Sequence, residues 1–403
     1  LLLGAAAFPD ESNDYSTFFL VGVPKEGQDL TEVKRILLDE VEKLKRGEFS
    51  AEMLKAIIAN ERRYEMQNLQ SNRSRVNKFL SSFIYQIPYG DIVSQLDRYA
   101  KITKDDVVRV ANKYLTTNSY ACVYKRQGDN ANPTKVEKPA ITPIEMNREL
   151  QSDFVRGLGK MHAERLQPQY LDFDKDLSKP TLAKGQQLLY VQNKENELFT
   201  LDFIVKKGAN MDPALDLASD LLSYLGCATM TSEQFNTRLY ALAADAYAYA
   251  ANEETHFVIS GLQENFDATL ALLEEWVLTL QPDNAILKEL ISDRIKAHED
   301  AKSSQQSCFS HLRSVGTYGL DVIRKTTLTP KQMKKLKAED LIARVQVLVP
   351  AIMRVAYFGP ATEEQIAGAL NSESRFIAMG DAAKQVADPR LQPLVVKKNE
   401  VVM

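Results

Sequence analysis

The order of strand-like and helix-like patterns in this sequence repeats once, and this repeat constrains the fold more than any other feature. A β-rich apolar run at 16–24 is followed by amphipathic helical stripes and then by a second β-rich run at 119–126. From residue 186 onward, strands and helical stripes again lead to a closing apolar run at 352–360. The last helix before each closing run has acidic residues in its first turn, in "DDV" and "EDL". The sequence therefore predicts an α+β fold of two repeated units, with helices packed on one face of a mainly antiparallel sheet.

Capping residues mark the helices expected in the first unit. Asp29, with Glu32 three positions later, has the pattern of a capping box and starts a helix. Ser50 is expected to cap a longer helix that continues to about Tyr85. A third helix is expected to start at Thr103.

Two paired strands are expected to open the second unit, at 186–193 and 197–210, with "NKEN" as the turn between them. A helix at 213–226 follows, and the next helix is expected to be capped by Thr231 or Ser232. The later elements predicted by pattern are that helix at about 231–243, two strands within 246–262, and helices at 265–281, 284–302 and 329–348.

Composition and pattern divide the chain into four segments. Residues 1–127 form the first unit, and a Pro/Asn-rich linker with one helix at 143–166 spans 128–180. The second unit covers 181–372, and a further domain starts within 373–403. The sequence has no initiator Met, and its last residues, "LQPLVVKKNEVVM", have the pattern of a new strand. We therefore expect the chain to be a piece of a longer protein.

The composition excludes several classes of protein. The net charge is −4 and the basic runs are short, which argues against a nucleic-acid-binding protein. No apolar run approaches the roughly 18–20 residues that a membrane span needs. Cys122, Cys227 and Cys308 are too widely spaced for a disulfide framework or a CxxC metal site, and each is expected to be a small buried residue.

The helical stretch "LASDLLSYLGCAT" (217–229) places two serines four residues apart, on one face of a helix. Together with the preceding "VKKGAN" turn, it is similar to a segment of the M16 metallopeptidases (pitrilysin/insulinase family). In active members, the corresponding helix has the form LAHFLEHMLFKGT and carries the inverted zinc motif HxxEH. Aligned without a gap, the first His of that motif falls on Ser219, its Glu on Leu222 and its second His on Ser223.

These three replacements remove the chemistry of the motif. Two imidazoles at i and i+4 converge on one Zn²⁺ at about 2.0–2.1 Å, and the Glu serves as general base for the metal-bound water. Neutral hydroxyls are poor zinc ligands, and Leu222 cannot accept a proton. The resemblance implies a third ligand, a Glu, near Arg294 to Glu299, but Glu299 alone would not hold zinc. We therefore expect this chain to contain no catalytic, metal-binding or cofactor-binding residues, with zinc in a catalytic domain that it lacks.

The resemblance covers most of the chain. The segment after the serine helix, including "SGLQENFDATLALLEEW", resembles the family, and so does "YAKITKDDVVRVANKYL" at the end of the first unit. It implies that 1–127 are the C-terminal part of one M16-type domain, 128–180 the linker between halves, 181–372 a complete domain with a degenerate zinc motif, and 373–403 the start of another.

The function that this resemblance implies is the non-catalytic portion of an M16-type zinc metalloendopeptidase, forming part of the chamber that encloses peptide substrates. The alternative is an inactive M16-like subunit or scaffold that supports a partner peptidase. An unrelated α+β binding protein is a third reading. The implied partners are peptide substrate, bound by the full-length protein, and the remaining M16 domains, and a homodimer is also compatible. The compartment is unknown, and family analogy favours a periplasmic or secreted protein.

Other motifs in the sequence do not complete a site. His298 and Glu299 begin an HExxH pattern, but Lys302 stands at the second His position. The four histidines have no ligand spacing and are expected at the surface or in local hydrogen bonds. "RGLGK" (156–160) lacks the rest of a P-loop, and "SSQQSCFS" (303–310) lacks a base for a nucleophile.

Overall fold

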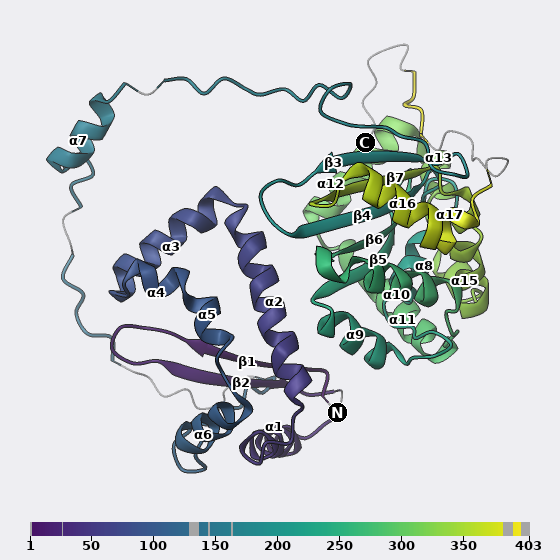
Figure 1. Cartoon of the computed structure of the whole chain (residues 1–403). Coiled ribbons are helices and arrows are strands. Elements are labelled where there is room, and N and C mark those ends of the chain that lie inside the picture. The colour runs from purple at the N-terminus through teal and green to yellow at the C-terminus, as the bar shows by residue number, and fades with distance from the viewer. Residues whose placement is uncertain are drawn as a thin grey trace.

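The first unit consists of a β-hairpin and the helices that follow it, as seen in a computed structural model (Figure 1). The structure describes residues 2–25, 27–128, 137–143, 146–162, 164–381 and 390–395. Strands β1 (Gly4–Asp10) and β2 (Thr17–Val23) pair antiparallel. The helices of the unit are α1 (Leu30–Lys45), α2 (Ala51–Leu69), α3 (Asn72–Tyr85), α4 (Tyr89–Val93), α5 (Gln95–Tyr99) and α6 (Lys104–Tyr114).

The predicted helix starts in this unit are confirmed, but one predicted helix is two. Asp29 and Ser50 cap α1 and α2 by accepting hydrogen bonds from the backbone N–H of Thr31 and Met53. The prediction of one long helix from Ser50 to Tyr85 is wrong, because α2 ends at Leu69. Ser71 there accepts from the N–H of Ser74 and starts α3 as a separate helix.

The predicted strand at 119–126 is also wrong, since these residues follow α6 without regular structure. Its side chains are exposed, and Val123 is 90% accessible to solvent. A strand needs a neighbour for its backbone groups, and β1 and β2 pair only with each other among the described residues.

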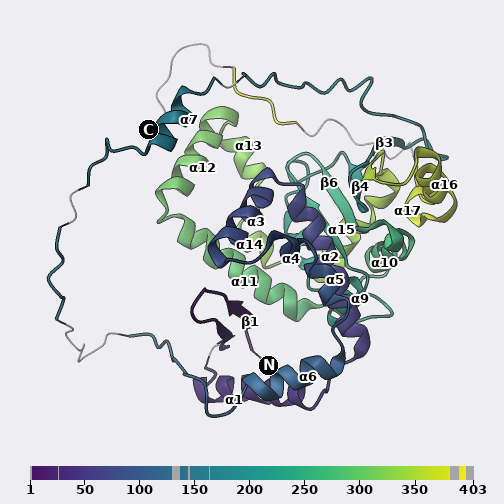
Figure 2. The same ribbon diagram turned by 60° about the vertical axis from the view of Figure 1, so that its left-hand side comes forward.

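Only α7 (Asp153–Lys160) is helical within the range 143–166, which was predicted as one helix. None of its residues is buried, and it lies away from both units in Figure 1, whereas the view in Figure 2 draws it next to α12 in projection. Without a surface to pack on, a short helix gains little stability, so the longer prediction is wrong. Residues 144–145 and 163 of that range lie outside the described residues.

The second unit contains a five-stranded sheet in the order β3-β7-β4-β6-β5. The strands are β3 (Gln187–Gln192), β4 (Leu198–Val205), β5 (Ala244–Ala250), β6 (Thr255–Leu262) and β7 (Arg354–Gly359). Both strands predicted at its start are present, but their direct pairing is wrong. The closing strand β7 lies between them, parallel to β3 and antiparallel to β4.

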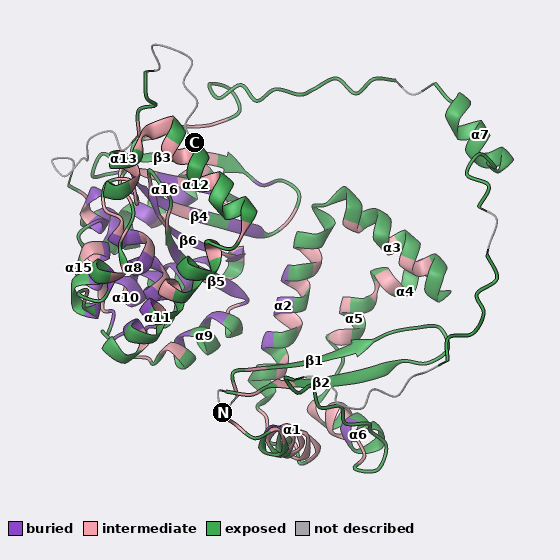
Figure 3. Cartoon of the chain, turned by 180° about the vertical axis from the view of Figure 1, so that it is seen from behind, coloured by how far each residue is buried: buried purple, intermediate pink, exposed green. Residues whose placement is uncertain are grey.

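Helices cover one face of this sheet, as predicted. The helices of this unit are α8 (Ala214–Leu222), α9 (Ser232–Ala241), α10 (Phe266–Leu278), α11 (Asn284–Ala301), α12 (Gln305–Tyr318), α13 (Leu320–Lys325), α14 (Pro330–Met333) and α15 (Ala338–Gln346), and α8, α9 and α10 pack directly on the strands. The prediction of one helix at 329–348 is wrong. Lys337 has an extended backbone conformation, which separates α14 from α15. Figure 3 shows that buried residues gather in this unit, whereas the first unit is mostly exposed.

The core of the second unit continues beyond residue 372. Helices α16 (Glu363–Glu373) and α17 (Arg375–Ala378) follow β7. Phe376 is buried against the rings of Phe203 and Phe257. The buried carboxylate of Glu274 accepts hydrogen bonds from the backbone N–H of Arg375, at 2.9 Å, and of Phe376, at 3.1 Å. Residues 390–395 are not a strand, and the rest of the strand expected near the end lies outside the described residues.

The described elements of the first unit follow the same order as the elements from β5 to α15 of the second unit, and the combination of a sheet with packed helices confirms the α+β class. The hairpin β1–β2 corresponds to β5–β6, and helices α1, α2 and α3 correspond to α10, α11 and α12. Both α3 and α12 are 14 residues long, begin after a capping serine and end at a tyrosine. Helix α6 likewise corresponds to α15. None of the described helices is long and apolar enough to cross a membrane.

Candidate functional site

Helix α8, which carries the two serines, is held in place by the turn that precedes it. The backbone N–H groups of Ala209 and Asn210 donate to the carbonyls of Ala251 and Asn252, both at 2.9 Å. A Cβ on Gly208 would lie 2.3 Å from the Ala251 oxygen, so this close approach of two backbones requires glycine. The "VKKGAN" turn therefore fixes the start of α8 against the loop between β5 and β6.

The three positions that match the zinc motif lie in different surroundings. Ser219 is buried, and its Oγ donates to the carbonyl of Leu215 on the same helix at 2.8 Å. Leu222 is fully buried in the core. Ser223 follows the last residue of α8 and is exposed. These residues share a helix but do not point their side chains into one common site.

An arginine of α11 faces α8 in the region near which the resemblance implies a third ligand. Arg294 of α11 pairs with Asp216, at 2.9 Å, and with Asp220, one turn later on α8. All three side chains are at least one third exposed. Glu299 lies farther along α11, where its carboxylate is exposed and pairs with Lys302 at 2.7 Å. That hydrogen bond lowers the pKa of Glu299.

The residues at this place do not fit a zinc ion. The only polar groups at the motif positions are two serine hydroxyls, of which one is committed to a backbone carbonyl. The Arg294 guanidinium pairs with both acids of α8, Asp216 and Asp220. Within the described parts of the chain, no group of three or more His, Cys, Asp or Glu side chains could hold a metal ion. We therefore derive no chemistry through a metal in this chain.

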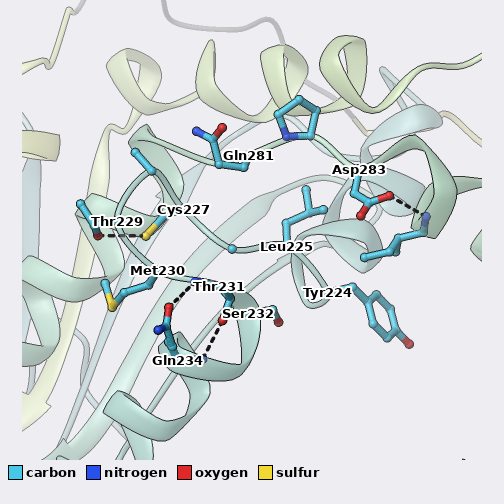
Figure 4. A pocket seen from close by; sticks show the side chains of 14 residues that line it. Tyr224, Leu225, Cys227, Thr229, Met230, Thr231, Ser232, Gln234, Gln281 and Asp283 are labelled. Carbon is cyan, nitrogen blue, oxygen red and sulfur yellow. Dashed lines mark hydrogen bonds between the residues drawn. The ribbon is translucent and has the colours of Figure 1, made fainter. Parts of the chain in front are cut away.

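A cavity of about 510 Å³ lies at the C-terminal end of α8 (Figure 4). It is lined by the segment 224–232 and by residues at the start of α11. Three of its polar side chains serve as helix caps: Thr231 and Gln234 form a capping box on α9, and Asp283 accepts from the N–H groups of Ala285 and Ile286. A fourth, Thr229, donates its hydroxyl to the carboxylate of Glu275 at 2.5 Å.

The loop that lines this cavity is tied closely to the core. The indole N–H of Trp276 donates to the carbonyl of Leu225 at 3.1 Å. A Cβ on Gly226 would lie 2.4 Å from the Met230 oxygen, so the loop folds back on itself at a glycine. Cys227 in the loop is buried, as expected. Cys122 and Cys308 are exposed, contrary to expectation, because Cys122 lies in the exposed segment 119–126 and Cys308 lies on α12, of which no residue is buried.

A polar cluster that the sequence did not predict lies on the face of the sheet opposite the helices. There the Nδ1 of His256 lies 2.8 Å from the Oδ2 of Asp202, and the ring of Tyr249 stacks on the imidazole at 4.5 Å. The other oxygen of Asp202 is buried and has no hydrogen-bond partner within the described ranges. Burial and the nearby Asp202 carboxylate raise the pKa of Tyr249. The only sequence signal was the alternation in "AYAYA", which was correctly interpreted as a strand.

The other histidines are where the sequence placed them, at the surface. His162, His298 and His311 are all exposed. The "RGLGK" segment forms the end of α7, and "SSQQSCFS" forms the start of α12 with Ser304 as its cap. Both segments thus have the structural roles that their sequences favoured.

Known proteins were compared with this chain by sequence and by structure. No family model matches the sequence, and no curated protein matches it. Similar solved structures include the periplasmic protease PqqL from Escherichia coli, with 16% identity, a TM-score of 0.47, and coverage of 98% of this chain and 46% of that chain. The ferredoxin protease FusC, in complex with Arabidopsis ferredoxin, has 13% identity and a TM-score of 0.47 over 97% of this chain and 46% of that chain.

The inactive domain of an M16 peptidase from Pseudomonas fluorescens is a further similar structure. It has 16% identity and a TM-score of 0.46, and the match covers 54% of each chain. These solved structures are M16 peptidases or a domain of one, the family that the sequence resembles. The chain spans about half the length of the solved proteins it matches.

Proposed function

We propose that this chain is the non-catalytic portion of an M16-type zinc metalloendopeptidase, in which it forms part of the chamber that encloses peptide substrates. One observation carries the proposal. Helix α8 follows the turn and strand order of the family's zinc helix, yet Ser219 is buried with its hydroxyl bonded to Leu215, Leu222 lies in the core, and Ser223 faces solvent. The chain thus keeps the framework of the catalytic domain without the groups that hold zinc or accept a proton.

In this proposal, cleavage takes place in a domain outside the 403 residues, and this chain contributes a wall that limits which peptides enter. The open face of the second sheet supports this role, since it carries exposed aromatic side chains and the His256–Asp202 pair rather than a layer of helices. The proposed compartment is the periplasm or the outside of the cell. It is proposed by analogy with relatives such as PqqL, which is described as periplasmic.

The alternative function is an inactive subunit or scaffold that supports a separate peptidase. The absence of the motif's ligand residues from α8 favours this alternative equally. The two proposals differ only in whether the HxxEH motif lies in the same polypeptide or in a separate peptidase. An HxxEH motif in the reading frame upstream of residue 1 would favour the single-chain enzyme, and a frame without it would favour the scaffold.

A cleavage assay tests the proposed enzyme directly. We expect the full-length gene product to hydrolyse a quenched fluorescent peptide, to lose this activity with a chelator and to regain it with zinc. The 403-residue chain alone should not cleave the peptide under the same conditions. Zinc-dependent cleavage by the 403-residue chain alone would contradict the proposal, and a full-length protein that is inactive with zinc would leave the scaffold as the better account.

A further inference from the structure

The face of the second sheet opposite the helices carries large apolar side chains that are exposed. Asp202, Val258 and Tyr247 stand side by side on this face, because they are paired across β4, β6 and β5. The same face presents four apolar side chains that are each more than one third exposed: Tyr247 and Tyr249 of β5, Phe358 of β7 and Val191 of β3. We call the surface formed by Asp202 and these four side chains the aromatic face. Apolar side chains gathered in this way indicate a contact surface.

Helix α2 shows what binds at one end of this side of the sheet. Leu198 of β4 lies on the same side as the aromatic face and is buried in a small apolar cluster. Ala59 and Met66 of α2 pack on that cluster. On the same helix, the buried Arg63 pairs with Asp245 of β5 at 2.6 Å. Where this side of the sheet is covered, it therefore accepts apolar side chains together with a basic one.

The aromatic face has one carboxylate without an arginine or lysine partner among the described residues. Nearby, the carboxylate of Glu254 pairs with the guanidinium of Arg354. Asp202 pairs only with His256 within the described ranges, and its other oxygen has no hydrogen-bond partner there. The Asp202 side chain is 20% exposed. Burial, and next the Asp202 carboxylate, raise the pKa of Tyr247, so the charge of Asp202 acts at the surface of the aromatic face. A positively charged ligand group balances this charge.

Apolar side chains flank Asp202 at a spacing that fits an extended peptide. Tyr247 lies two strands from Asp202 on one side, and Phe358 lies one strand from it on the other. Neighbouring strands are about 4.8 Å apart, so the two apolar positions are about 14 Å apart across the sheet. An extended peptide places the side chains of residues i, i+2 and i+4 on one side and spans about 13 Å from i to i+4.

We propose that the aromatic face binds an extended peptide segment that crosses the strands, with apolar side chains at i and i+4 and a lysine or arginine at i+2. The apolar side chains lie over Tyr247 and Phe358, and the basic side chain pairs with Asp202. This binding mode rests on the proposed function, because it names the class of peptide that the chamber wall selects.

A second copy of this chain is a poorer occupant of the aromatic face. Two copies that meet through the same patch form an isologous contact, in which residues near the centre face their own counterparts. Asp202 of one copy then lies close to Asp202 of the other, and like charges placed together disfavour binding. A peptide with a basic centre has no such penalty.

Fluorescence anisotropy on the 403-residue chain tests the proposal. The probe is a fluorescein-labelled peptide with the sequence Gly-Phe-Gly-Lys-Gly-Phe-Gly, and the matched peptide has Glu in place of Lys. We expect the Lys peptide to bind at least about tenfold more tightly, since Glu places a like charge next to Asp202. Asp202→Asn should reduce this difference to less than about threefold. The proposal is overturned by equal or absent binding of the two peptides, or by a preference for Lys that Asp202→Asn leaves unchanged.

Two aromatic variants locate the binding site. Tyr247→Ala should weaken binding of the Lys peptide by about tenfold, because it removes one apolar side of the aromatic face. Phe309→Ala is the matched control, since Phe309 is an exposed aromatic residue on α12, outside this face, and it should leave binding unchanged. Equal effects of the two variants would place the peptide elsewhere and overturn the proposal.

Sedimentation equilibrium distinguishes the second copy. Self-association of the wild type that Tyr247→Ala abolishes would identify a second copy as the occupant and would also overturn the peptide site. Peptide binding is measured without cleavage. The peptide site can therefore fail while the full-length protein shows zinc-dependent cleavage, and the reverse, so failure of the site and failure of the proposed function are distinguishable.

Discussion

A serine in a helix always has one acceptor within reach, the backbone carbonyl four residues earlier. Ser219 uses that carbonyl, on Leu215, and is buried beside the core, whereas Ser223 lies at the end of α8 and is exposed. Their spacing in the sequence predicted one shared helical face, which is the requirement for two zinc ligands. Burial, however, depends on what packs against each turn of the helix, and the sequence does not contain this information locally.

The two serines should therefore respond differently to the residue that the family carries. Ser219→His places a larger side chain in a packed region, and we expect it to lower the free energy of unfolding by about 1–3 kcal/mol. Ser223→His is the matched control at an exposed position and should change it by less than about 0.5 kcal/mol. Urea unfolding followed by circular dichroism measures both. Equal effects of the two substitutions would show that their surroundings do not differ as described.

At the scale of elements, most helix starts were predictable because a cap is a local interaction. Asp29, Ser50, Thr103 and Thr231 all cap helices where the sequence placed them. Asp29, however, does so without the Glu32 contact of a full capping box, since its side chain accepts from Thr31.

Strand order was not predictable, because pairing depends on distant parts of the chain. Nothing in the sequence of β3 and β4 indicates that β7, which is about 150 residues further along the chain, lies between them. The segment 119–126 has the composition of a strand but lacks partners among the described residues. Helix breaks at Ser71 and Lys337 were missed for a related reason, since each interrupts a continuous helical pattern at a residue without a strong stop signal.

The capping box of α6 predicts a dependence of stability on pH. Hydrogen bonds from Thr103 and Arg109 lower the pKa of Asp106 from 3.8 to about 2. Because the folded-state pKa is depressed, the stabilisation is complete above pH 3.8 and is lost as the pH falls through about 2. The melting temperatures of the wild type and of Asp106→Asn should thus differ at pH 7 and converge toward pH 2.

The neighbouring acid provides the control for this measurement. Asp105 lies in the same first turn but outside the capping box. Asp105→Asn should change the melting temperature less than Asp106→Asn does at pH 7. A difference between wild type and Asp106→Asn that persists unchanged at pH 2 would rule out the carboxylate as its source.

At the scale of the whole molecule, the two units are joined by α2. Ala59 and Met66 pack on an apolar cluster at one end of the second sheet, and α2 also contacts α9. Two polar side chains are buried in this interface. Asn60 donates to the carbonyl of Tyr240 at 2.7 Å, and Arg63 pairs with Asp245 at 2.6 Å.

This interface should hold the units together without the linker. After protease cleavage within 128–180, we expect the two halves of the wild type to elute together in gel filtration. The double variant Asn60→Ala, Arg63→Ala should elute as separate halves, because it removes both buried polar contacts. Arg62→Ala is the control, since Arg62 pairs with Glu197 and Glu264 at the exposed rim and such pairs contribute about 0–1 kcal/mol. Co-elution of the double variant would contradict the role of α2.

The proposed function requires that this chain keep the framework of a zinc peptidase domain without its metal site. The most direct test is the zinc content of the purified 403-residue chain after incubation with zinc and removal of excess metal, measured by mass spectrometry of the element. We expect well below one zinc ion per chain, because Ser219, Leu222 and Ser223 replace the ligands and base of the motif. One tightly bound zinc ion per chain, retained against a competing chelator, would contradict this account.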